Sequence, residues 1–125
     1  MEVGFSASHQ IKGYKGSCAR MHGHNWKVRA YVRSNELDKL GLVIDFRVLK
    51  KIVQEVISPF DHNVINEHPD FANQNPSSEN IARWIFHKLK DKLKSPRYWL
   101  YAVEIFESES SGLFYTEEEE ETTST

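Results

Sequence analysis

The chain has 125 residues, of which 39% are hydrophobic and 27% are charged, and its formal net charge is -2 at pH 7. This size and composition fit one globular domain, and no apolar run is long enough to cross a bilayer as a helix. The single cysteine, Cys18, excludes a disulfide within the chain and fits a reducing compartment. Residues 1–10 lack the basic and apolar regions of an export signal, so the sequence predicts a cytoplasmic protein.

The charges are unevenly distributed along the chain. Five glutamates fill positions 117–121, so we expect a single domain over 1–116 and a disordered acidic tail over 117–125. The segment 3–35 has no Asp or Glu and contains Lys12, Lys15, Arg20, Lys27, Arg29 and Arg33. This positive charge indicates an anionic ligand, although solvated surface charge explains it equally well. The chain lacks the high pI and the motifs of nucleic-acid-binding domains, so no nucleic-acid partner is predicted.

Two strands are predicted near the N-terminus. One face of the segment 4–9 (GFSASH) carries Phe5, Ala7 and His9. One face of the segment 24–33 (HNWKVRAYVR) carries Trp26, Val28, Ala30 and Val32. The opposite face of this second strand is charged and polar, which is typical of a strand with one buried face. In the same alternation, His22 and His24 continue the face of Trp26.

Two amphipathic helices are predicted in the middle of the chain. The first begins after Asp45, which suits its N-cap, and ends before Pro59. Its apolar stripe consists of Phe46, Leu49, Ile52, Val53 and Val56. The second begins after Ser77, its expected N-cap, and its stripe consists of Ile81, Trp84, Ile85, Leu89 and Leu93. The stripe of the second helix is interpreted as part of the core.

Two further strands are predicted after Pro96. The segment 98–107 (YWLYAVEIFE) is rich in aromatic and β-branched residues, and 113–116 can return as its antiparallel partner after Gly112. The order is therefore ββααββ, an α+β fold with a four-stranded antiparallel sheet and two helices. Such a sheet has two open edges, which favours its completion by oligomerisation.

The segment 20–26 (RMHGHNW) places two histidines two positions apart on one face of a strand. Residues i and i+2 of a strand lie about 6.5 to 7 Å apart, so His22 and His24 can converge on one ion. Taken alone, this pair fits two ordinary polar side chains better than a metal site. His9 can supply a third imidazole from the neighbouring strand. Three neutral histidines with an open fourth position are typical of a catalytic zinc site.

Other polar residues near these histidines could take part in proton transfer. A thiol beside a divalent cation and basic residues deprotonates readily, so Cys18 is a candidate base or nucleophile. It could instead be a fourth zinc ligand or an inert thiol. Asp61 and His62 form a candidate proton-transfer pair, although such a dipeptide is usually only part of a turn. Two histidines are interpreted as surface residues, His68 and His87.

Six motifs in this order resemble the 6-pyruvoyltetrahydropterin synthase family. They are FSASH, CARMHGHNW, GLVIDF, FDHNVIN, NPSSENIA and VEIFES, and they cover most of the chain from Phe5 to Ser108. The spacing Cys-x-x-x-His-Gly-His resembles the branch that forms 6-carboxy-5,6,7,8-tetrahydropterin for queuosine and other deazapurines. Pyruvoyl-forming enzymes of the mammalian type place their cysteine farther upstream of that histidine.

The resemblance implies a T-fold, or tunnelling fold, whose subunits close into a trimeric barrel and stack as a homohexamer, a dimer of trimers, with sites at subunit interfaces. It implies a zinc ion held by His9, His22 and His24. The implied substrate is the small molecule 7,8-dihydroneopterin triphosphate. The implied product is 6-carboxy-5,6,7,8-tetrahydropterin, formed with release of triphosphate and acetaldehyde.

The resemblance also implies roles for individual residues. Cys18 as a thiolate would take a proton from a C–H bond of the substrate, and Asp61 would orient His62 for proton transfer on its other side. Glu107 matches the family's pterin anchor, because a carboxylate can accept two parallel N–H bonds. Strand alternation places Glu107 on the buried face and Glu104 on the opposite face, but alternation alone does not select between the two carboxylates.

Three alternative functions remain open at this point. The first is the pyruvoyl-forming reaction, which eliminates triphosphate and retains the side chain. The second is side-chain cleavage toward folate, in which a glutamate replaces the cysteine, so the presence of Cys18 argues against it. The third is a non-catalytic pterin- or metal-binding module, which does not need the full set of proton-transfer residues. A three-histidine site can also hold first-row divalent ions other than zinc.

Overall fold

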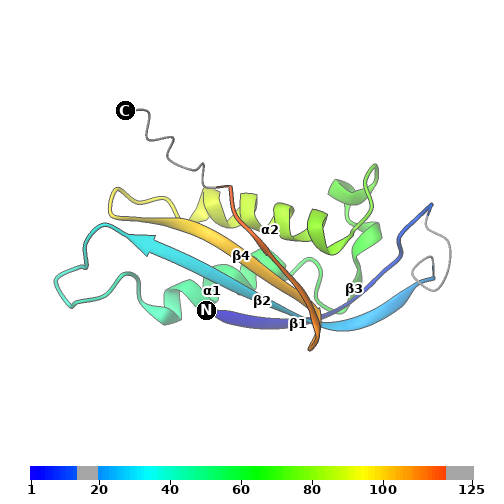
Figure 1. The fold of residues 1–125 in the computed structure, drawn as a ribbon, viewed down its shortest axis with the longest axis horizontal. Coiled ribbons are helices and arrows are strands. Elements are labelled where there is room, and N and C mark those ends of the chain that lie inside the picture. The colour runs from blue at the N-terminus through cyan, green and yellow to red at the C-terminus, as the bar shows by residue number, and fades with distance from the viewer. Residues whose placement is uncertain (14–19, 118–125) are drawn as a thin grey trace.

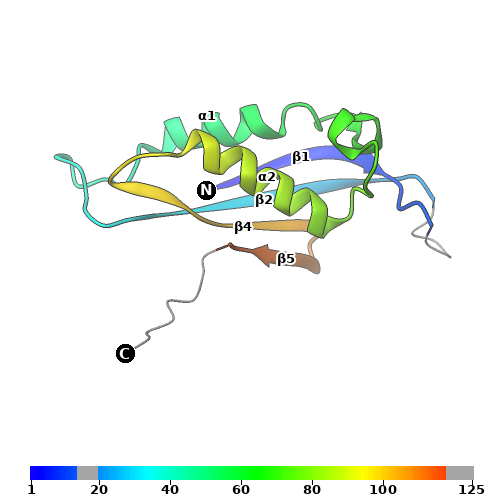
Figure 2. The same cartoon turned by 90° about the horizontal axis from the view of Figure 1, so that it is seen from above.

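The computed structural model describes residues 1–13 and 20–117, in which a sheet carries both helices on one face (Figure 1). The strands are β1 (Glu2–His9), β2 (His22–Ser34), β3 (Asn63–Val64), β4 (Tyr98–Ser108) and β5 (Ser111–Tyr115). They lie in the order β3-β1-β2-β4-β5. The helices are α1 (Phe46–Ile57) and α2 (Ser78–Lys92), with the short 3-10 helices η2 (Ile65–Glu67) and η3 (Pro69–Phe71) between them. Figure 2 shows α1 and α2 side by side over the same face of the sheet.

The α+β class and the order of the long elements are confirmed, but the sheet differs from the four-stranded antiparallel one that was predicted. Across the described residues it has five strands, because β3 pairs in parallel with β1. In this pairing Ala7 lies beside Asn63 and Ser8 beside Val64. A strand of two residues is too short to produce an alternating pattern, so the sequence carries no signal for it.

The buried face of the sheet follows the predicted alternation. Trp26 and Val28 are fully buried. The Trp26 ring stacks on Phe5 with 5.9 Å between the ring centroids, and its indole Nε1 donates a hydrogen bond of 3.1 Å to the Ala7 carbonyl. Because one side chain both packs against β1 and hydrogen-bonds to its backbone, Trp26 fixes the two strands together next to the histidines at their ends.

Both predicted helix caps are confirmed. The Asp45 carboxylate accepts from the Arg47 amide, and Ser77 Oγ accepts from the Asn80 amide at 3.2 Å. Phe46, the first residue of the apolar stripe predicted for α1, is 76% exposed. As the first residue of α1, it lies at the rim of an apolar cavity instead of under the helix.

A single guanidinium organises the segment 35–45 between β2 and α1. Arg97 Nη1 donates to the carbonyls of Glu36 at 3.1 Å and Leu42 at 3.0 Å, and Nη2 donates to the Val43 carbonyl at 2.6 Å. Replacing Arg97 by alanine is therefore expected to lower the free energy of unfolding by about 1.5–3 kcal/mol. Urea unfolding measures this change. Arg97→Lys should keep only part of the stability that the hydrogen bonds of Arg97 provide, because lysine lacks the fork of donors. A change below about 0.5 kcal/mol would show that the segment needs no such support.

Two further predictions concern membrane-spanning helices and the C-terminal tail. No helix within the described ranges is long and apolar enough to cross a membrane. The last strand ends at Tyr115, and residues 118–125, most of the predicted acidic tail, lie outside the described residues. The boundary after residue 116 therefore stays a prediction.

Candidate metal centre

The pairing of β1 with β2 brings three histidines together. The antiparallel register places His9 opposite His22 and Ala7 opposite His24. Since His22 and His24 alternate onto the same face as Trp26, all three imidazoles lie on the buried side of the sheet, near its end. The ring centroids are 5.3 Å apart for His9 and His22, 5.4 Å for His9 and His24, and 4.9 Å for His22 and His24. The convergence predicted from the sequence is present.

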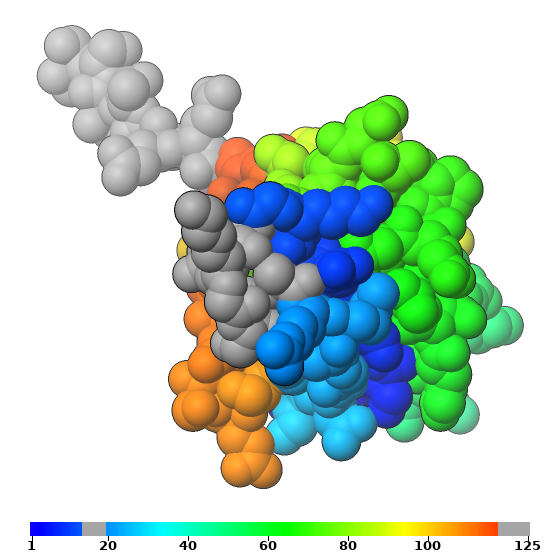
Figure 3. Space-filling view, turned by 90° about the vertical axis from the view of Figure 1, so that its right-hand side faces the viewer, coloured from blue at the N-terminus to red at the C-terminus, as the bar shows by residue number. Residues whose placement is uncertain are grey.

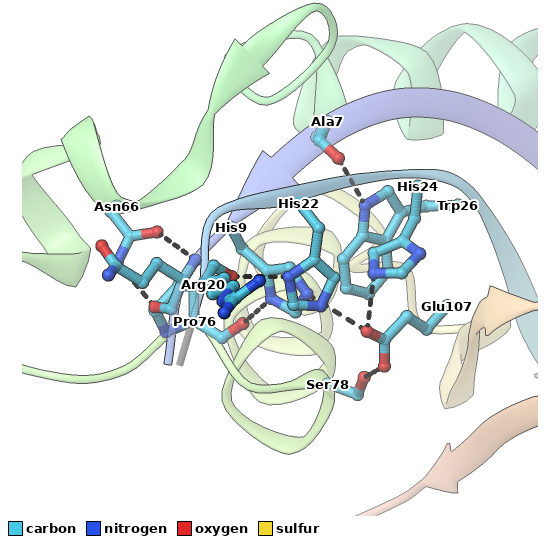
Figure 4. A network of polar contacts seen from close by, with 11 residues as sticks. Ala7, His9, Arg20, His22, His24, Trp26, Asn66, Pro76, Ser78 and Glu107 are labelled. Atoms are coloured by element: carbon cyan, nitrogen blue, oxygen red, sulfur yellow. Dashed lines mark hydrogen bonds and ion pairs between the residues drawn. The ribbon is translucent and has the colours of Figure 1, made fainter. Parts of the chain in front are cut away.

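Backbone carbonyls orient two of these rings (Figure 4). His9 Nδ1 lies 2.8 Å from the Pro76 carbonyl oxygen, and His22 Nδ1 hydrogen-bonds to the Arg20 carbonyl. A carbonyl oxygen can only accept, so in both rings the proton is on Nδ1 and the lone pair of a neutral imidazole is on Nε2. Histidines that bind metals commonly donate their other ring N–H in this way.

A carboxylate from the end of β4 completes the cluster. Glu107 Oε1 lies 3.1 Å from His9 Nε2 and 3.0 Å from His24 Nε2. The second oxygen, Oε2, accepts a hydrogen bond of 3.3 Å from Ser78 Oγ at the start of α2. Glu104 points away from this cluster, because its carboxylate accepts from the Tyr31 hydroxyl. The strand alternation therefore separated the two carboxylates correctly.

The donor atoms of the cluster fit a divalent metal ion. One ligand atom from each of His9, His22, His24 and Glu107 lies within 4.8 Å of the others. An unprotonated Nε2 and a carboxylate oxygen are both acceptors, so the contact between His9 and Glu107 is favourable only when a proton or a metal ion lies between them. Imidazole and carboxylate ligands in this number are those that zinc prefers in proteins.

The environment of His24 supports the same interpretation. Its Nε2 is buried and makes no hydrogen bond among the described residues, although Glu107 Oε1 lies 3.0 Å away. Burial lowers the pKa of His24 below its ordinary value. The charge of Glu107 opposes this shift, and charges on His9 and His22 would add to it. Burial therefore favours the neutral imidazole of His24, which is the form that binds a metal.

The cluster opens into a cavity of about 330 Å³ that His9, His22, Ser78 and Glu107 help to line. Figure 3 views this end of the molecule, where the blue ends of β1 and β2 lie between the green segment that precedes α2 and the orange end of β4. Residues from distant parts of the sequence thus meet at one opening. Such a concave site with convergent polar groups is suited to a small ligand.

The structure keeps Asp61 and His62 together but does not bring them to this cluster. Asp61 Oδ1 accepts from the Ser6 amide at 3.0 Å and lies 3.0 Å from His62 Nδ1. His62 adopts a left-handed backbone conformation with φ of 61°, and its side chain is 82% exposed. It lines a second cavity, of about 580 Å³, together with residues of β1, β2 and β3 that include His24. Cys18 lies outside the described residues.

The predicted basic segment is partly neutralised in the fold. Arg29 Nε lies 3.1 Å from Glu2 Oε1, and its Nη1 lies 3.4 Å from Glu104 Oε1. The sequence segment alone has no acid, but the sheet places acids from β1 and β4 on either side of this arginine. Arg29 is thus a poor candidate for binding an anion, whereas Lys12 and Arg20 are nearer to the cluster in sequence.

Sequence reasoning missed the parts of the centre that come from the start of α2. The Pro76 carbonyl orients His9, and Ser78 holds Glu107. A backbone carbonyl leaves no signal in a sequence, and Ser78 beside the N-cap serine was indistinguishable from ordinary capping. The inward position of Glu107 was the one available signal that it faces the histidines.

Comparisons with known proteins give consistent matches over nearly the whole chain. A family model described as 6-pyruvoyl tetrahydropterin synthase matches residues 1–118. A Synechocystis protein named 6-carboxy-5,6,7,8-tetrahydropterin synthase is 35% identical over 119 residues, covering 91% of this chain and 88% of that protein. An Archaeoglobus fulgidus protein that provisionally has the same name is 42% identical over 92 residues, covering 74% of this chain and 75% of its own length. The structure of Caenorhabditis elegans 6-pyruvoyl tetrahydropterin synthase matches with a TM-score of 0.83 at 27% identity, covering 94% of this chain and 93% of that chain.

Proposed function

Because the chain belongs to the 6-pyruvoyl tetrahydropterin synthase family, we propose that it is a zinc-dependent 6-carboxy-5,6,7,8-tetrahydropterin synthase. In this proposal it converts 7,8-dihydroneopterin triphosphate to 6-carboxy-5,6,7,8-tetrahydropterin and releases triphosphate and acetaldehyde. The observation that carries the proposal is the convergence of His9, His22 and His24 beside Glu107 at the mouth of a cavity. The names of the Synechocystis and Archaeoglobus relatives favour this product.

The three histidines are proposed to hold the metal through Nε2 of each ring. A zinc ion held by these residues would supply a Lewis acid for an oxygen of the substrate side chain. The protein fixes the ligands in advance, since the Pro76 and Arg20 carbonyls set the tautomers of His9 and His22. Such preset ligands need little reorganisation when substrate binds.

Proton transfer is assigned to Cys18 and to the pair Asp61 and His62. Cys18 as a thiolate takes the proton from the activated C–H bond. Asp61 is held by the Ser6 amide and orients His62, which moves protons on the opposite side of the substrate. Because His62 lies in a cavity that His24 also lines but that His9, His22 and Glu107 do not, a complete site is proposed to combine the cluster of one subunit with the pair of its neighbour in a homohexamer.

Glu107 is proposed to anchor the pterin ring by accepting N–H bonds from its amide-like edge. The second carboxylate of β4, Glu104, is already bonded to Tyr31 on the opposite face. The charge of the substrate triphosphate is assigned to basic side chains, of which Lys12 and Arg20 are the described candidates because they are near the cluster in sequence.

A product assay tests the proposed reaction. Zinc-loaded protein is incubated with 7,8-dihydroneopterin triphosphate, and acetaldehyde and the pterin product are identified by mass spectrometry. Acetaldehyde with 6-carboxytetrahydropterin is the expected result. The pyruvoyl product without acetaldehyde would assign the chain to the reaction named for the C. elegans relative. Pterin binding without any turnover would instead support a non-catalytic binding module.

Replacing Cys18 by alanine is expected to reduce turnover by about 10²- to 10⁴-fold, because the reaction loses its proposed base. The zinc content and the thermal unfolding temperature should stay at wild-type values, since three histidines still hold the metal. Both turnover and bound zinc are measured on the same preparation. Unchanged turnover would exclude Cys18 as the base, and loss of zinc would identify it as a ligand.

A further inference from the structure

Glu107 faces the histidine cluster, although the proposed function assigns it to the pterin. We propose that Glu107 has two alternative partners. In the substrate-free protein its Oε1 is a fourth ligand of the metal, and pterin binding withdraws the carboxylate from the metal to the N–H groups of the ring. This inference rests on the proposed function and adds a coupling between substrate recognition and metal coordination.

The first support is the position of the carboxylate. Glu107 Oε1 lies 3.1 Å and 3.0 Å from the Nε2 atoms of His9 and His24, the atoms that the tautomer of His9 and the buried, unpaired nitrogen of His24 assign to the metal. An anchor that served the pterin alone would not need to contact two nitrogens of the proposed metal ligands. As a metal ligand, the same oxygen binds the cation that these two nitrogens also bind.

The second support is how the carboxylate is held. Its other oxygen, Oε2, accepts from Ser78 Oγ, and Ser78 is the first residue of α2. The positive end of a helix dipole and one hydroxyl stabilise the carboxylate only moderately. The side chain of Glu107 is also 29% exposed beside the cavity, so a ligand entering that cavity can reach it. The carboxylate is thus held toward the metal without being locked there.

The third support is the requirement for an open coordination position. Three histidines and a carboxylate fill a four-coordinate zinc site, whereas a catalytic site keeps one position for water or substrate. If Glu107 leaves when the ring binds, the position opens only when substrate is present. The negative charge moves from the metal to the pterin at the same time, which leaves a more strongly polarising centre.

The exchange predicts that metal and pterin oppose each other's binding when the pterin has no side chain. By reciprocity, unsubstituted pterin should bind metal-free protein about 5- to 150-fold more tightly than zinc-loaded protein, and saturating pterin should weaken zinc binding by the same factor. Pterin fluorescence measures the first affinity, and competition with a zinc chelator measures the second. This test uses the wild-type chain, so it does not depend on the folding of any variant.

Variants at two positions of β4 show whether Glu107 binds the metal directly or contributes only its negative charge. Glu107→Gln and Glu107→Asp should each lower zinc affinity at least about tenfold, since glutamine is a poor zinc ligand and aspartate keeps the charge but shortens the reach. Glu104→Gln is the matched control, on the same strand but bonded to Tyr31 on the opposite face, and should keep wild-type affinity. With cobalt in place of zinc, both Glu107 variants should change the visible spectrum, and unsubstituted pterin should change the spectrum of the wild type.

The outcomes distinguish this inference from the proposed function. Equal zinc affinities for the wild type, Glu107→Gln and Glu104→Gln would overturn the ligand assignment, even if turnover is normal. Independent binding of zinc and unsubstituted pterin would overturn the exchange. A spectrum that depends on Glu107 in a protein without turnover would support the ligand assignment while removing the proposed reaction.

Discussion

Replacing His24 by alanine is expected to lower zinc affinity by more than about 100-fold and to reduce turnover at subsaturating zinc by at least the same factor. His24 offers a buried Nε2 that makes no hydrogen bond in the described part of the chain and lies 3.0 Å from Glu107 Oε1, a position suited to sharing a cation with that carboxylate. Its removal also costs the site one of only three imidazoles. Chelator competition and single-turnover kinetics on the same preparations measure the two quantities.

Thermal unfolding provides a readout of the same variant that does not depend on catalysis. A ligand that binds only the folded state stabilises it by about 2.7 kcal/mol when its free concentration is 100 times Kd. Zinc should therefore raise the unfolding temperature of the wild type and leave that of His24→Ala almost unchanged. His87→Ala is the control, because His87 lies on α2 and pairs with Glu117 at 2.6 Å, away from the cluster. An equal response to zinc in His24→Ala and the wild type would disprove the metal centre at this position.

The sequence predicted the histidine cluster well because strand alternation is local. Trp26 fixes the inward face of β2, and His22 and His24 follow from it by steps of two residues. The resemblance then supplied the T-fold, which the likeness to the C. elegans enzyme confirms. His9 required the additional assumption that β1 pairs with β2, and the register of that pairing places it directly opposite His22.

The features that the sequence did not predict depend on contacts between distant segments. The short β3 forms because the chain after His62 runs along β1, which no pattern of two residues can indicate. The contact of Glu107 with the histidines depends on how β4 ends beside the start of α2, where Ser78 holds it. Phe46 continues the apolar stripe of α1 but is exposed, because helical periodicity does not show at which residue a helix stops packing against the sheet.

Mixing two inactive variants is expected to restore activity if each site combines residues from neighbouring subunits. His24→Ala lacks a metal ligand, and His62→Ala lacks the proposed proton-transfer imidazole, so each alone should lose at least about 100-fold in turnover. Of the four cluster residues, only His24 lines the cavity of His62, whereas His9, His22 and Glu107 line another cavity, which gives this experiment its rationale. After the variants are unfolded and refolded together, about one site in four should combine an intact cluster with an intact imidazole, as expected for random assembly around a ring.

The mixture distinguishes shared sites from sites within one subunit. If each subunit contained a whole site, every site in the mixed assembly would still carry one of the two substitutions, and activity would stay at the level of the separate variants. Refolding each variant alone gives the baseline, and refolding the wild type with His62→Ala shows that mixed assemblies form. Recovery well above the baseline would place Asp61 and His62 across an interface from the metal. Their separation from the histidine cluster within one chain would then be a consequence of how the enzyme distributes its site between subunits.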